Sequence, residues 1–389
     1  MSFLIILHKL ERMEIKISTK EEEVLVNRLK SRNDTEAMRI KRYLAMTDLS
    51  RTKASPIYEI VEKARGMELL RHFDNIVIPE IVPADVSFDL FNFAQDHPAR
   101  SESDTYFVDD KNILRTHDTV MWHYYLQLPE IKKKIAAGEP MGVICYGKVY
   151  RKDEIDRNHM NVFHQMGGLY LIPDGKKNLT IDDLKSALSE IVQTIFGKNV
   201  VYRFNEDVFP YTDPSLEVEV EINGKWMEIL GGGMPRKNVL KNFGVTGYHG
   251  WAFGFGLERL AIISMELPDI RLLWSDNERV KKQLRLGHRF KQVSKYPAIV
   301  RDISFIVDFA SFTPKNYFDL VRDVVGDLAE EMTLVDQYEN TGQFGAGRKS
   351  YTYRIIYRSL ARTLTDGEVN VMHKKLEEKT KEIYGAEVR

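Results

Sequence analysis

The sequence predicts an α+β protein: a large, mostly antiparallel sheet flanked by helices, followed along the chain by a ferredoxin-like α/β sandwich. Between residues 74 and 260, short β-rich runs are separated by Gly, Pro and Asn with few helices between them, which favours antiparallel pairing. After residue 296 the expected order of strand, helix, two strands and a closing helix is typical of a ferredoxin-like sandwich. The 389 residues are enough for two or three domains.

Residues 1–50 are expected to form a helical N-terminal extension. Apolar residues recur there at helical spacing between 19 and 46, with a break near 31–34. The first domain, 51–285, is expected to open with a helix at Ser55-Pro56, because proline suits the first helical turn. One amphipathic helix, at 181–196, interrupts its strands. The strands are predicted at 76–81, 141–150, 162–172, 200–204, 217–222 and 226–230.

A polar, basic stretch near residues 277–295 predicts a linker, which we place at 286–294. The second domain, 295–389, ends in a helix for which Thr365 and Glu368 have capping-box spacing. Its elements are predicted as strand 299–307, helix 314–331, strand 333–338, a Gly-rich loop 341–350, strand 351–357 and a helix from 366.

Composition limits the classes of function. The net charge of −1 gives no overall basic excess, so any RNA contact must come from local basic patches. Cys145 is the only cysteine, which excludes an intramolecular disulfide and a cysteine-rich zinc site, and its apolar neighbours predict a buried strand residue. No stretch approaches the roughly 20 apolar residues that span a bilayer. The first residues resemble neither a secretory signal nor an acid-poor transit peptide, which predicts an intracellular, cytoplasmic protein, with the mitochondrial matrix as the alternative.

The first constellation with chemical meaning ends at Gln165. Two strands joined by a loop are expected to bring Arg151, His159 and Gln165 together, with Phe163 beside them. A nucleotide site needs this mixture, because arginine offers a permanent planar charge to a phosphate and an aromatic face stacks on a base. The alternative is an exposed hairpin with a charged face.

The second constellation is the segment Trp-Ala-Phe-Gly-Phe-Gly-Leu-Glu-Arg at 251–259. Gly254 and Gly256 allow close approach of the backbone at a strand end, and Arg259 falls early in the helix that follows. A dinucleotide fingerprint is rejected, because that motif opens a parallel βαβ unit and requires an acidic residue about twenty positions later.

Together the two segments resemble motifs two and three of the class II aminoacyl-tRNA synthetases. In that family the motif-two arginine holds the α-phosphate of ATP, and adenine lies between a phenylalanine and the motif-three arginine. The matching residues are Arg151, Phe163 and Arg259. Residues 56–66 and 73–79 resemble motif one, a helix leading to a strand that ends in proline.

More specific strings resemble the α subunits of the phenylalanyl-tRNA synthetases, which makes 51–285 a catalytic domain. The second domain resembles their ferredoxin-fold anticodon-binding domain. The presence of both domains on one chain is typical of the monomeric, mitochondrial-type members. The first group comprises Asp-His-Pro-Ala-Arg at 96–100, Asp-Thr-Tyr at 104–106, Leu-Arg-Thr-His at 114–117, Phe-His-Gln at 163–165, Phe-Pro-Tyr-Thr-Asp-Pro-Ser at 209–215 and Met-Glu-Ile-Leu-Gly at 227–231. The second comprises Ser-Lys-Tyr-Pro at 294–297, Arg-Asp-Ile-Ser-Phe at 301–305, Tyr-Arg-Ile at 353–355 and Arg-Thr-Leu-Thr at 362–365.

The resemblance implies ATP and Mg²⁺ as cofactors and a reaction that joins phenylalanine to tRNA(Phe). Arg151 would hold the α-phosphate and the substrate carboxylate, His159 the phosphate tail, and Asp153 the adenine amino group. The implied catalytic residues are Arg151, His159 and Arg259. The implied ATP-binding residues are Arg151, Asp153, Asn158, His159, Met160, Phe163 and Arg259.

The same resemblance implies an amino-acid site. His117, Thr119 and Gln165 would hydrogen-bond the polar end of phenylalanine, and Glu228 would help to hold Mg²⁺ or a substrate group. For the aromatic residues of the set the alternative is an ordinary core position, and for Glu228 a solvated strand end. The set is Phe107, His117, Thr119, Trp122, Gln165, Gly167, Phe209, Tyr211, Glu228, Ala252 and Phe253.

Three positions depart from the family pattern: Trp122 stands for a glutamine, Gly167 for a glutamate and Tyr211 for a phenylalanine. The family's glutamate lies close to the substrate ammonium. Without it, Gln165 and Thr119 are left to hold the ammonium, with a cation–π contact from Trp122. We therefore expect weaker amino-acid binding than the family shows, which Gly167→Glu is expected to improve.

Basic residues of the second domain are predicted to face tRNA, and Tyr351 and Tyr353 to stack on unpaired anticodon bases. The alternative is a solvated sheet face. The predicted tRNA-binding residues are Lys295, Arg301, Arg354, Arg358 and Arg362, with Arg348 and Lys349 in the same patch.

Two other functions stay open at the level of sequence. One is an adenylating paralogue that serves another amino acid or acceptor, which the residues at Trp122 and Gly167 permit. The other is a non-catalytic, tRNA-binding regulator, which is disfavoured because Arg151, Phe163 and Arg259 are all retained. The resemblance also implies a monomer.

Overall fold

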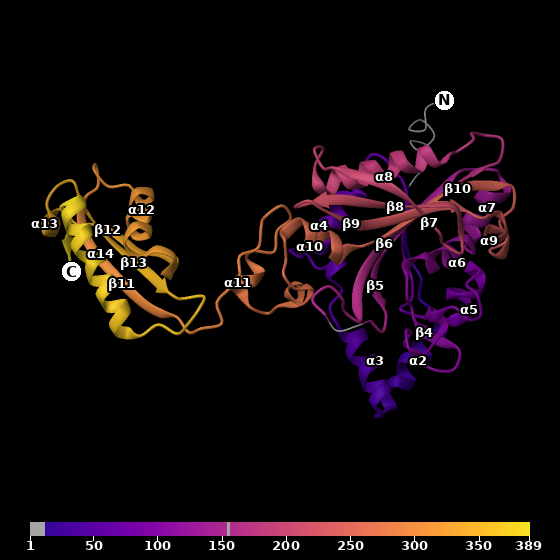
Figure 1. Ribbon diagram of the computed structural model, residues 1–389, viewed down its shortest axis with the longest axis horizontal. Coiled ribbons are helices and arrows are strands. Elements are labelled where there is room, and N and C mark those ends of the chain that lie inside the picture. The colour runs from indigo at the N-terminus through magenta and orange to yellow at the C-terminus, as the bar shows by residue number, and fades with distance from the viewer. Residues whose placement is uncertain (1–11, 154–155) are drawn as a thin grey trace. The chain divides into compact units, whose positions relative to one another are not determined.

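The structure is a computed structural model that describes residues 12–153 and 156–389 (Figure 1). The chain divides into two compact units, Met1–Phe290 and Lys291–Arg389, each with its own sheet. The division falls inside the stretch 286–294 that we place as a linker.

Three helices precede most of the first sheet, as the apolar spacing predicts. Capping side chains explain where two of them begin: Asp34 accepts a hydrogen bond from the amide of Ala37, and Ser55 accepts one from the amide of Ile57. The predicted break near 31–34 is therefore confirmed. The helices are α2 (Lys20–Ser31), α3 (Thr35–Ala45) and α4 (Pro56–Arg65).

An eight-stranded sheet forms the centre of the first unit and is mostly antiparallel, as predicted. Among its described strands, only the pairs β1–β2 and β2–β5 are parallel. In spatial order the strands are β1 (Glu14–Lys16), β2 (Asp74–Val77), β5 (Met141–Tyr150), β6 (Val162–Pro173), β10 (Tyr248–Gly256), β9 (Lys225–Pro235), β8 (Thr212–Ile222) and β7 (Tyr202–Asp207).

Three predictions about strands need correction. β1 lies within the extension 1–50 that was expected to be helical, and it joins the main sheet by pairing with β2. The strand expected at 76–81 is two strands, because the chain leaves the main sheet after β2 and pairs β3 (Ile81–Pro83) with β4 (Asn112–Leu114). The strand predicted at 226–230 is longer, because β9 continues through three glycines to Pro235. A Cβ at Gly232 would lie 2.8 Å from the carbonyl oxygen of Ala252, so the close approach of two strands accounts for glycine there.

Helices and loops cover both faces of this sheet. On one face α4 packs against α8 (Ile181–Phe196) and α10 (Leu257–Met265), and α8 matches its predicted range (Figure 1). The chain between residues 84 and 136 covers the other face, where Phe91 and Trp122 are fully buried against the strands. Burial of one such side chain contributes roughly 1.5–3 kcal/mol. The shorter helices are α5 (Ala84–Ser87), α6 (Met121–Leu126), α7 (Pro129–Ala136), α9 (Lys237–Asn242) and α11 (Glu278–Lys281).

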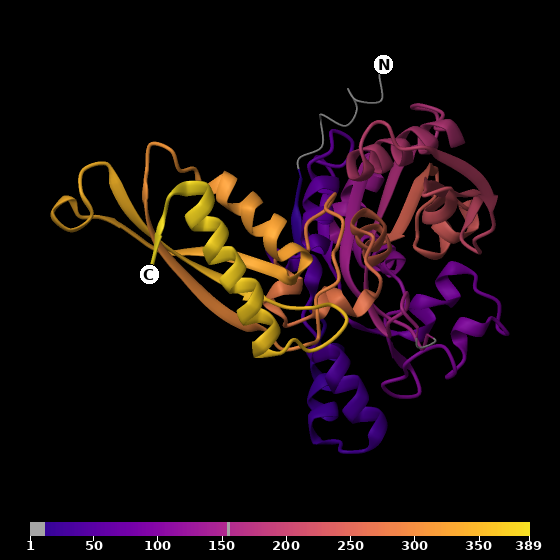
Figure 2. The ribbon, with the colours of Figure 1, turned by 60° about the vertical axis from the view of Figure 1, so that its left-hand side comes forward.

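The second unit is the predicted sandwich, an antiparallel sheet in the order β12–β13–β11–β14 covered by α12 and α14. Figure 2 shows these two helices side by side. Both hydrogen bonds of the capping box between Thr365 and Glu368 are present. The elements are β11 (Ile299–Asp308), α12 (Pro314–Val325), β12 (Ala329–Glu339), α13 (Thr341–Phe344), β13 (Arg348–Tyr357), α14 (Asp366–Tyr384) and β14 (Glu387–Val388).

Two expectations for this unit are wrong. The helix predicted at 314–331 ends at Val325, because Gly326 adopts a φ of 65°, a left-handed conformation that favours glycine and stops a helix. Tyr351 and Tyr353 are only 7% and 1% exposed, and both pack in the core with α12 and α14. Their rings stabilise the domain and are not available to stack on RNA bases.

Cys145 is buried in β5, as predicted, and burial raises the pKa of its thiol to about 12. A thiol with such a pKa is a core group and not a nucleophile. Among the helices of the described residues, none is both long and apolar enough to cross a membrane.

Candidate active site

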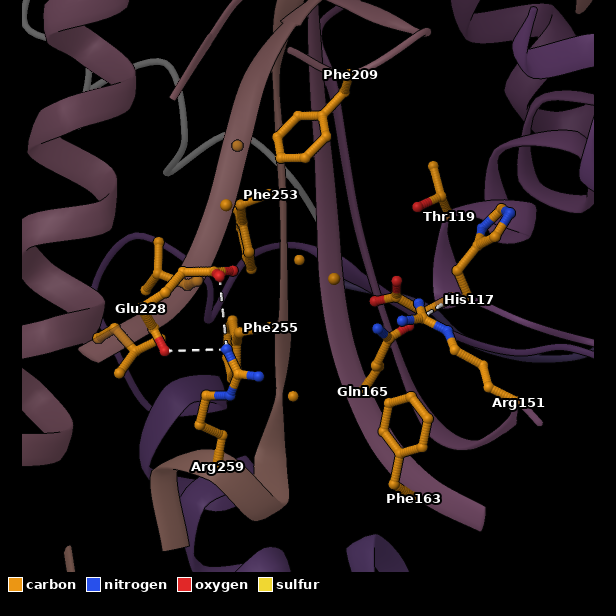
Figure 3. Close-up of a pocket in the computed structure, with 18 of the residues that line it drawn as sticks. His117, Thr119, Arg151, Phe163, Gln165, Phe209, Glu228, Phe253, Phe255 and Arg259 are labelled. Carbon is orange, nitrogen blue, oxygen red and sulfur yellow. Dashed lines mark hydrogen bonds and ion pairs between the residues drawn. The ribbon is translucent and has the colours of Figure 1, made fainter. Parts of the chain in front are cut away.

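A cavity of about 400 Å³ opens beside the buried cluster that contains Trp122 (Figure 3). β6, β9 and β10 line it together with the chain around His117 and the loop that follows Arg151. It brings together every predicted site residue of the first unit except Phe107. Residues that line it without having been predicted include Asp118, Met121, Thr212, Gly254, Phe255, Glu258 and Ile270.

The alternation of side chains along β6 builds this site. Phe163, Gln165 and Gly167 lie toward the cavity, whereas His164 between them points to the opposite face and is fully buried. In the pairing of β6 with β10, Gly167 stands opposite Gly254. The two glycines leave space above the cavity face of the sheet, and the Asp118 side chain occupies it over Gly167.

One end of the cavity combines a cation with an aromatic ring. The Nε of Arg151 donates a hydrogen bond to the Thr116 carbonyl at 2.9 Å, and its guanidinium lies 5.3 Å from the centre of the Phe163 ring. Burial lowers the pKa of Arg151, although a guanidinium stays charged in proteins. Figure 3 shows Arg259 on the other side of this end of the cavity. The gap between Phe163 and Arg259 suits a flat, electron-rich group next to an anion.

Glu228 and Arg259 form an ion pair at the rim. The Glu228 Oε2 and Arg259 Nη1 atoms are 3.5 Å apart, and Nη1 also donates to the Glu228 carbonyl at 3.2 Å (Figure 3). Burial raises the pKa of Glu228, while Arg259 lowers it. Among the described residues, no three His, Cys, Asp or Glu side chains gather into a metal site.

The loop that follows Arg151 supplies four predicted nucleotide-binding residues, of which His159 is anchored by a 2.9 Å contact between its Nδ1 atom and Asp156. The backbone amides of Asn158 and His159 also donate to Asp156. This carboxylate therefore organises the loop. The four that line the cavity are Asp153, Asn158, His159 and Met160.

The other end of the cavity is aromatic. The rings of Phe209 and Tyr211 are stacked with centres 5.9 Å apart, and Trp122 meets Tyr211 edge-on at 6.0 Å. Burial and the nearby Asp118 raise the pKa of Tyr211 to about 12, so its hydroxyl stays protonated. This end can enclose an apolar or aromatic side chain.

Two predicted pocket residues take other positions. Phe107 lies outside the cavity, where it forms a β-bridge with Ile113 and packs against the cluster of Trp122. Phe253 borders the cavity, but its ring lies over Gly168, where an added Cβ would meet it at 2.5 Å. The reason is the register, because Phe253 pairs with Gly168 on the face away from the cavity.

Asp118 is the main feature that sequence reasoning missed. Its side chain lies over Gly167, so closely that a Cβ built there would be 2.1 Å from Asp118 Oδ2. The expectation that Gly167→Glu improves binding does not fit this geometry. Burial raises the pKa of Asp118 to about 7, against the lowering effect of Arg115 and Arg151. The sequence did contain a signal for Asp118, because this residue stands between His117 and Thr119, which are both predicted amino-acid-binding residues.

On the opposite face of β6, His164 holds the sheet to the first turn of α10. Its Nδ1 atom lies 2.6 Å from Glu258, its backbone amide donates to the same carboxylate, and its Nε2 atom lies 3.3 Å from Asp48. Burial lowers the pKa of His164, but Glu258 and Asp48 outweigh burial and raise it to about 9. Glu258 precedes Arg259, so this pair fixes the helix turn that carries the cavity's second arginine.

The predicted tRNA-binding arginines of the second unit all lie beside carboxylates. Arg354 donates two hydrogen bonds to Asp302, and Arg362 donates two to Glu368. The other pairs are Arg301–Asp366, Arg358–Glu330, Arg348–Glu387 and Lys349–Glu339. Lys295 lies 5.6 Å from the centre of the Tyr296 ring. These contacts reduce the net positive charge of the predicted patch.

Comparison with known proteins gives two family matches that divide the chain in the same way as the fold. Residues 40–284 match the tRNA synthetases class II core domain (F), and residues 294–389 match the ferredoxin-fold anticodon binding domain. The first match covers more than half of the chain.

Several known proteins match this chain over most of its length and over most of their own. The chain is 38% identical over 320 residues to an Arabidopsis thaliana protein named phenylalanine–tRNA ligase, chloroplastic/mitochondrial, with 79% of this chain and 71% of the relative covered. It is 34% identical to the mitochondrial phenylalanine–tRNA ligase of Mus musculus, with 80% and 74% covered. For the mitochondrial enzyme of Saccharomyces cerevisiae the identity is 31%, with 79% and 81% covered.

The His164 cluster predicts a loss of stability at alkaline pH. Because the folded pKa of about 9 lies above the ordinary value of 6.5, the charged form stabilises the fold fully below pH 6.5 and loses this effect as pH rises through 9. We expect the free energy of unfolding to fall by about 1–3 kcal/mol between pH 7 and 9.5 in urea titrations. His164→Gln should remove most of this pH dependence, and an equal decrease in both proteins would show that other groups cause it.

Proposed function

Because the chain belongs to the phenylalanine–tRNA ligases, which share the class II tRNA synthetase core, we propose that its cavity activates phenylalanine with ATP and that the whole chain then charges tRNA. The observation that carries this proposal is the meeting of two arginines and an aromatic compartment in one cavity. Arg151 and Arg259 suit the nucleotide, while Phe209 and Tyr211 suit the side chain of phenylalanine.

The proposed first step forms phenylalanyl-adenylate. A carboxylate oxygen of phenylalanine attacks the α-phosphorus of ATP, the bond to the β-phosphate oxygen breaks, and pyrophosphate leaves. Both reactants are anionic, so the protein must align them and offset their repulsion. Arg151 is suited to this role because its guanidinium is buried at the cavity wall and oriented by the Thr116 carbonyl and the Phe163 ring.

The class II family uses ATP and a divalent metal. The assignment of individual residues to the parts of ATP and to the metal is part of this proposal. Adenine lies between Phe163 and Arg259, and His159 reaches the phosphate tail. Mg²⁺ is usually held by one or two carboxylates together with substrate phosphates, so a cluster of protein ligands is not required. Glu228 offers one carboxylate at the rim, and the metal would offset phosphate charge there.

The second unit is proposed to bind the anticodon of tRNA(Phe), consistent with its family match. Its predicted arginines can exchange their carboxylate partners for phosphates. The names of the relatives favour the mitochondrial alternative, and none of those quoted supports the cytoplasmic one. Action as a monomer stays part of the proposal.

The activity is tested by ATP–pyrophosphate exchange with each of the twenty amino acids. Phenylalanine should give the highest kcat/KM, because the aromatic compartment at Phe209, Tyr211 and Trp122 matches its side chain. A preference for a non-aromatic amino acid would show an adenylating paralogue. No exchange with any of them would indicate a tRNA-binding regulator.

Arg151→Ala should lower the exchange rate at least about 10²-fold, because loss of one group aimed at developing charge in a shielded site has effects of that size. Arg203→Ala is a matched control, since Arg203 forms an ion pair with Glu219 outside the cavity. Circular dichroism should show both variants folded. Near-normal exchange in Arg151→Ala would mean that the arginine only stabilises the loop.

Truncation after Phe290 should preserve exchange and abolish tRNA charging. The cut follows the division between the two units and keeps Phe290, whose amide donates to the Met265 carbonyl. Exchange and aminoacylation are measured on the same preparation. Full charging by the truncated chain would show that the second unit does not serve tRNA binding.

A further inference from the structure

The carboxylate of Asp118 lines the cavity, and no side chain of the described residues forms an ion pair with it. It is 5% exposed, and its Oδ2 atom has no hydrogen-bond partner among the residues that the structure describes. The backbone amides of Asp118 and Thr119 are the protein donors that lower its pKa. A buried carboxylate oxygen normally has a partner, because an unpaired one loses its solvation without compensation.

The nearby cations do not fill this role. Arg115 donates to the carbonyls of Lys148 and Ile78, at 2.7 and 3.2 Å. Arg151 donates to Thr116. Among the residues that the structure describes, neither arginine forms an ion pair with Asp118. The carboxylate is therefore placed for a cation that the protein itself does not supply.

Gly167 makes room for this carboxylate. A Cβ at Gly167 would lie 2.1 Å from Asp118 Oδ2, whereas a Cβ at Gly254 would make an ordinary contact, 3.6 Å from Asp118 Oδ1. Gly167 is not among the residues with positive φ, so its backbone conformation does not require glycine. The Asp118 side chain is the nearest group that a Cβ would meet, followed by the Phe253 carbonyl oxygen at 3.0 Å, so glycine at this position gives Asp118 its space.

The other carboxylates of the cavity wall either form ion pairs within the protein or belong to the loop that follows Arg151. Glu228 pairs with Arg259, and Glu258 pairs with His164 on the opposite face. Asp153 belongs to the loop that follows Arg151. Asp118 lines the same cavity as Tyr211 and Trp122 of the aromatic end.

We propose that Asp118 binds the α-ammonium group of the amino-acid substrate and that Gly167 is required to admit the Asp118 side chain. This inference rests on the proposed function and assigns its ammonium site. The aromatic end holds the substrate side chain, and Arg151 attracts the substrate carboxylate. The Asp118 carboxylate lies over Gly167, and the Asp118 amide donates to Gln165. Asp118 then selects α-amino acids over carboxylic acids that lack the amine.

Binding of the ammonium should depend on the ionisation of Asp118. The charged or titratable groups that face it are Arg115, His117, Cys145, Arg151 and Tyr211. Of these, burial together with Arg151 lowers the pKa of His117 to about 4, and burial raises the pKa values of Cys145 and Tyr211 to about 12. His117, Cys145 and Tyr211 therefore do not titrate near neutrality, whereas burial raises the pKa of Asp118 to about 7.

The test compares the Asp118→Asn variant with the unmodified protein, both full-length, in phenylalanine-dependent ATP–pyrophosphate exchange. Asparagine keeps the shape and removes the charge. Asp182→Asn is the control, because Asp182 is highly exposed on α8. We expect the KM for phenylalanine to rise about 10- to 100-fold in Asp118→Asn, as for loss of a charge-assisted hydrogen bond, while the KM for ATP stays the same.

Two competitive inhibitors separate an ammonium site from a general structural role. 2-Phenylethylamine keeps the amine and lacks the carboxylate, and 3-phenylpropionate keeps the carboxylate and lacks the amine. Asp118→Asn should weaken the amine by the same factor as phenylalanine and leave the acid unchanged within about twofold. Equal weakening of both inhibitors, or of neither, would overturn the proposal.

The pH profile gives an independent measurement. For the unmodified protein, kcat/KM for phenylalanine should fall about tenfold per pH unit below about pH 7, because protonation of Asp118 removes its charge. Asp118→Asn should lack this acid limb, and the same limb in both proteins would overturn the proposal. Failure of the unmodified protein to activate phenylalanine at all would instead refute the proposed function, so the two failures are distinguishable.

Discussion

The fold and the cavity both depend on the pairing of β6 with its neighbours, because β6 uses its two faces for different purposes. Phe163, Gln165 and Gly167 face the cavity, and His164 between them binds Glu258 beneath the sheet. A shift of one residue in the register would exchange these sets. The ion pair beneath the sheet resists such a shift, and it also positions α10, whose third residue is Arg259. The pair of His164 and Glu258 on one face of the sheet therefore determines where Arg259 lies at the cavity.

The buried charges of the first unit fall into two groups. His164, Glu258 and Asp48 compensate one another, so their burial holds strand and helix together. Asp118 and Arg151 are also buried at the cavity, but they compensate each other only in part, because burial outweighs the effect of each on the pKa of the other. Unpaired buried charge is unfavourable by several kcal/mol per ion in typical proteins, and a ligand of the opposite charge relieves this cost. In the proposed function, the ammonium group of the amino acid and the phosphates of the nucleotide would relieve this cost at Asp118 and Arg151.

Local sequence patterns were sufficient for much of the fold and less so for the site. Caps and apolar spacing located α4, α8 and α14, and the motif strings collected the cavity residues, because both depend on neighbours in the chain. Phe253 and Phe107 were misplaced since the side of a strand on which a ring lies depends on cross-strand register. Tyr353 was misplaced for a related reason. Burial of a β13 residue depends on helices that follow it and precede it in the chain.

Asp118 shows why a departure from a family pattern is best judged in three dimensions. Taken along the chain, glycine at 167 removes a carboxylate, and it first suggested weak amino-acid binding or another substrate. In space, Asp118 extends its carboxylate over that glycine, so the cavity still contains the negative charge and only its point of attachment has changed. The two positions then form one unit, because a side chain at 167 and the carboxylate of Asp118 exclude each other sterically. A cavity that keeps this charge beside an aromatic compartment is complementary to an aromatic α-amino acid. Gly167 is therefore not an argument for a different substrate.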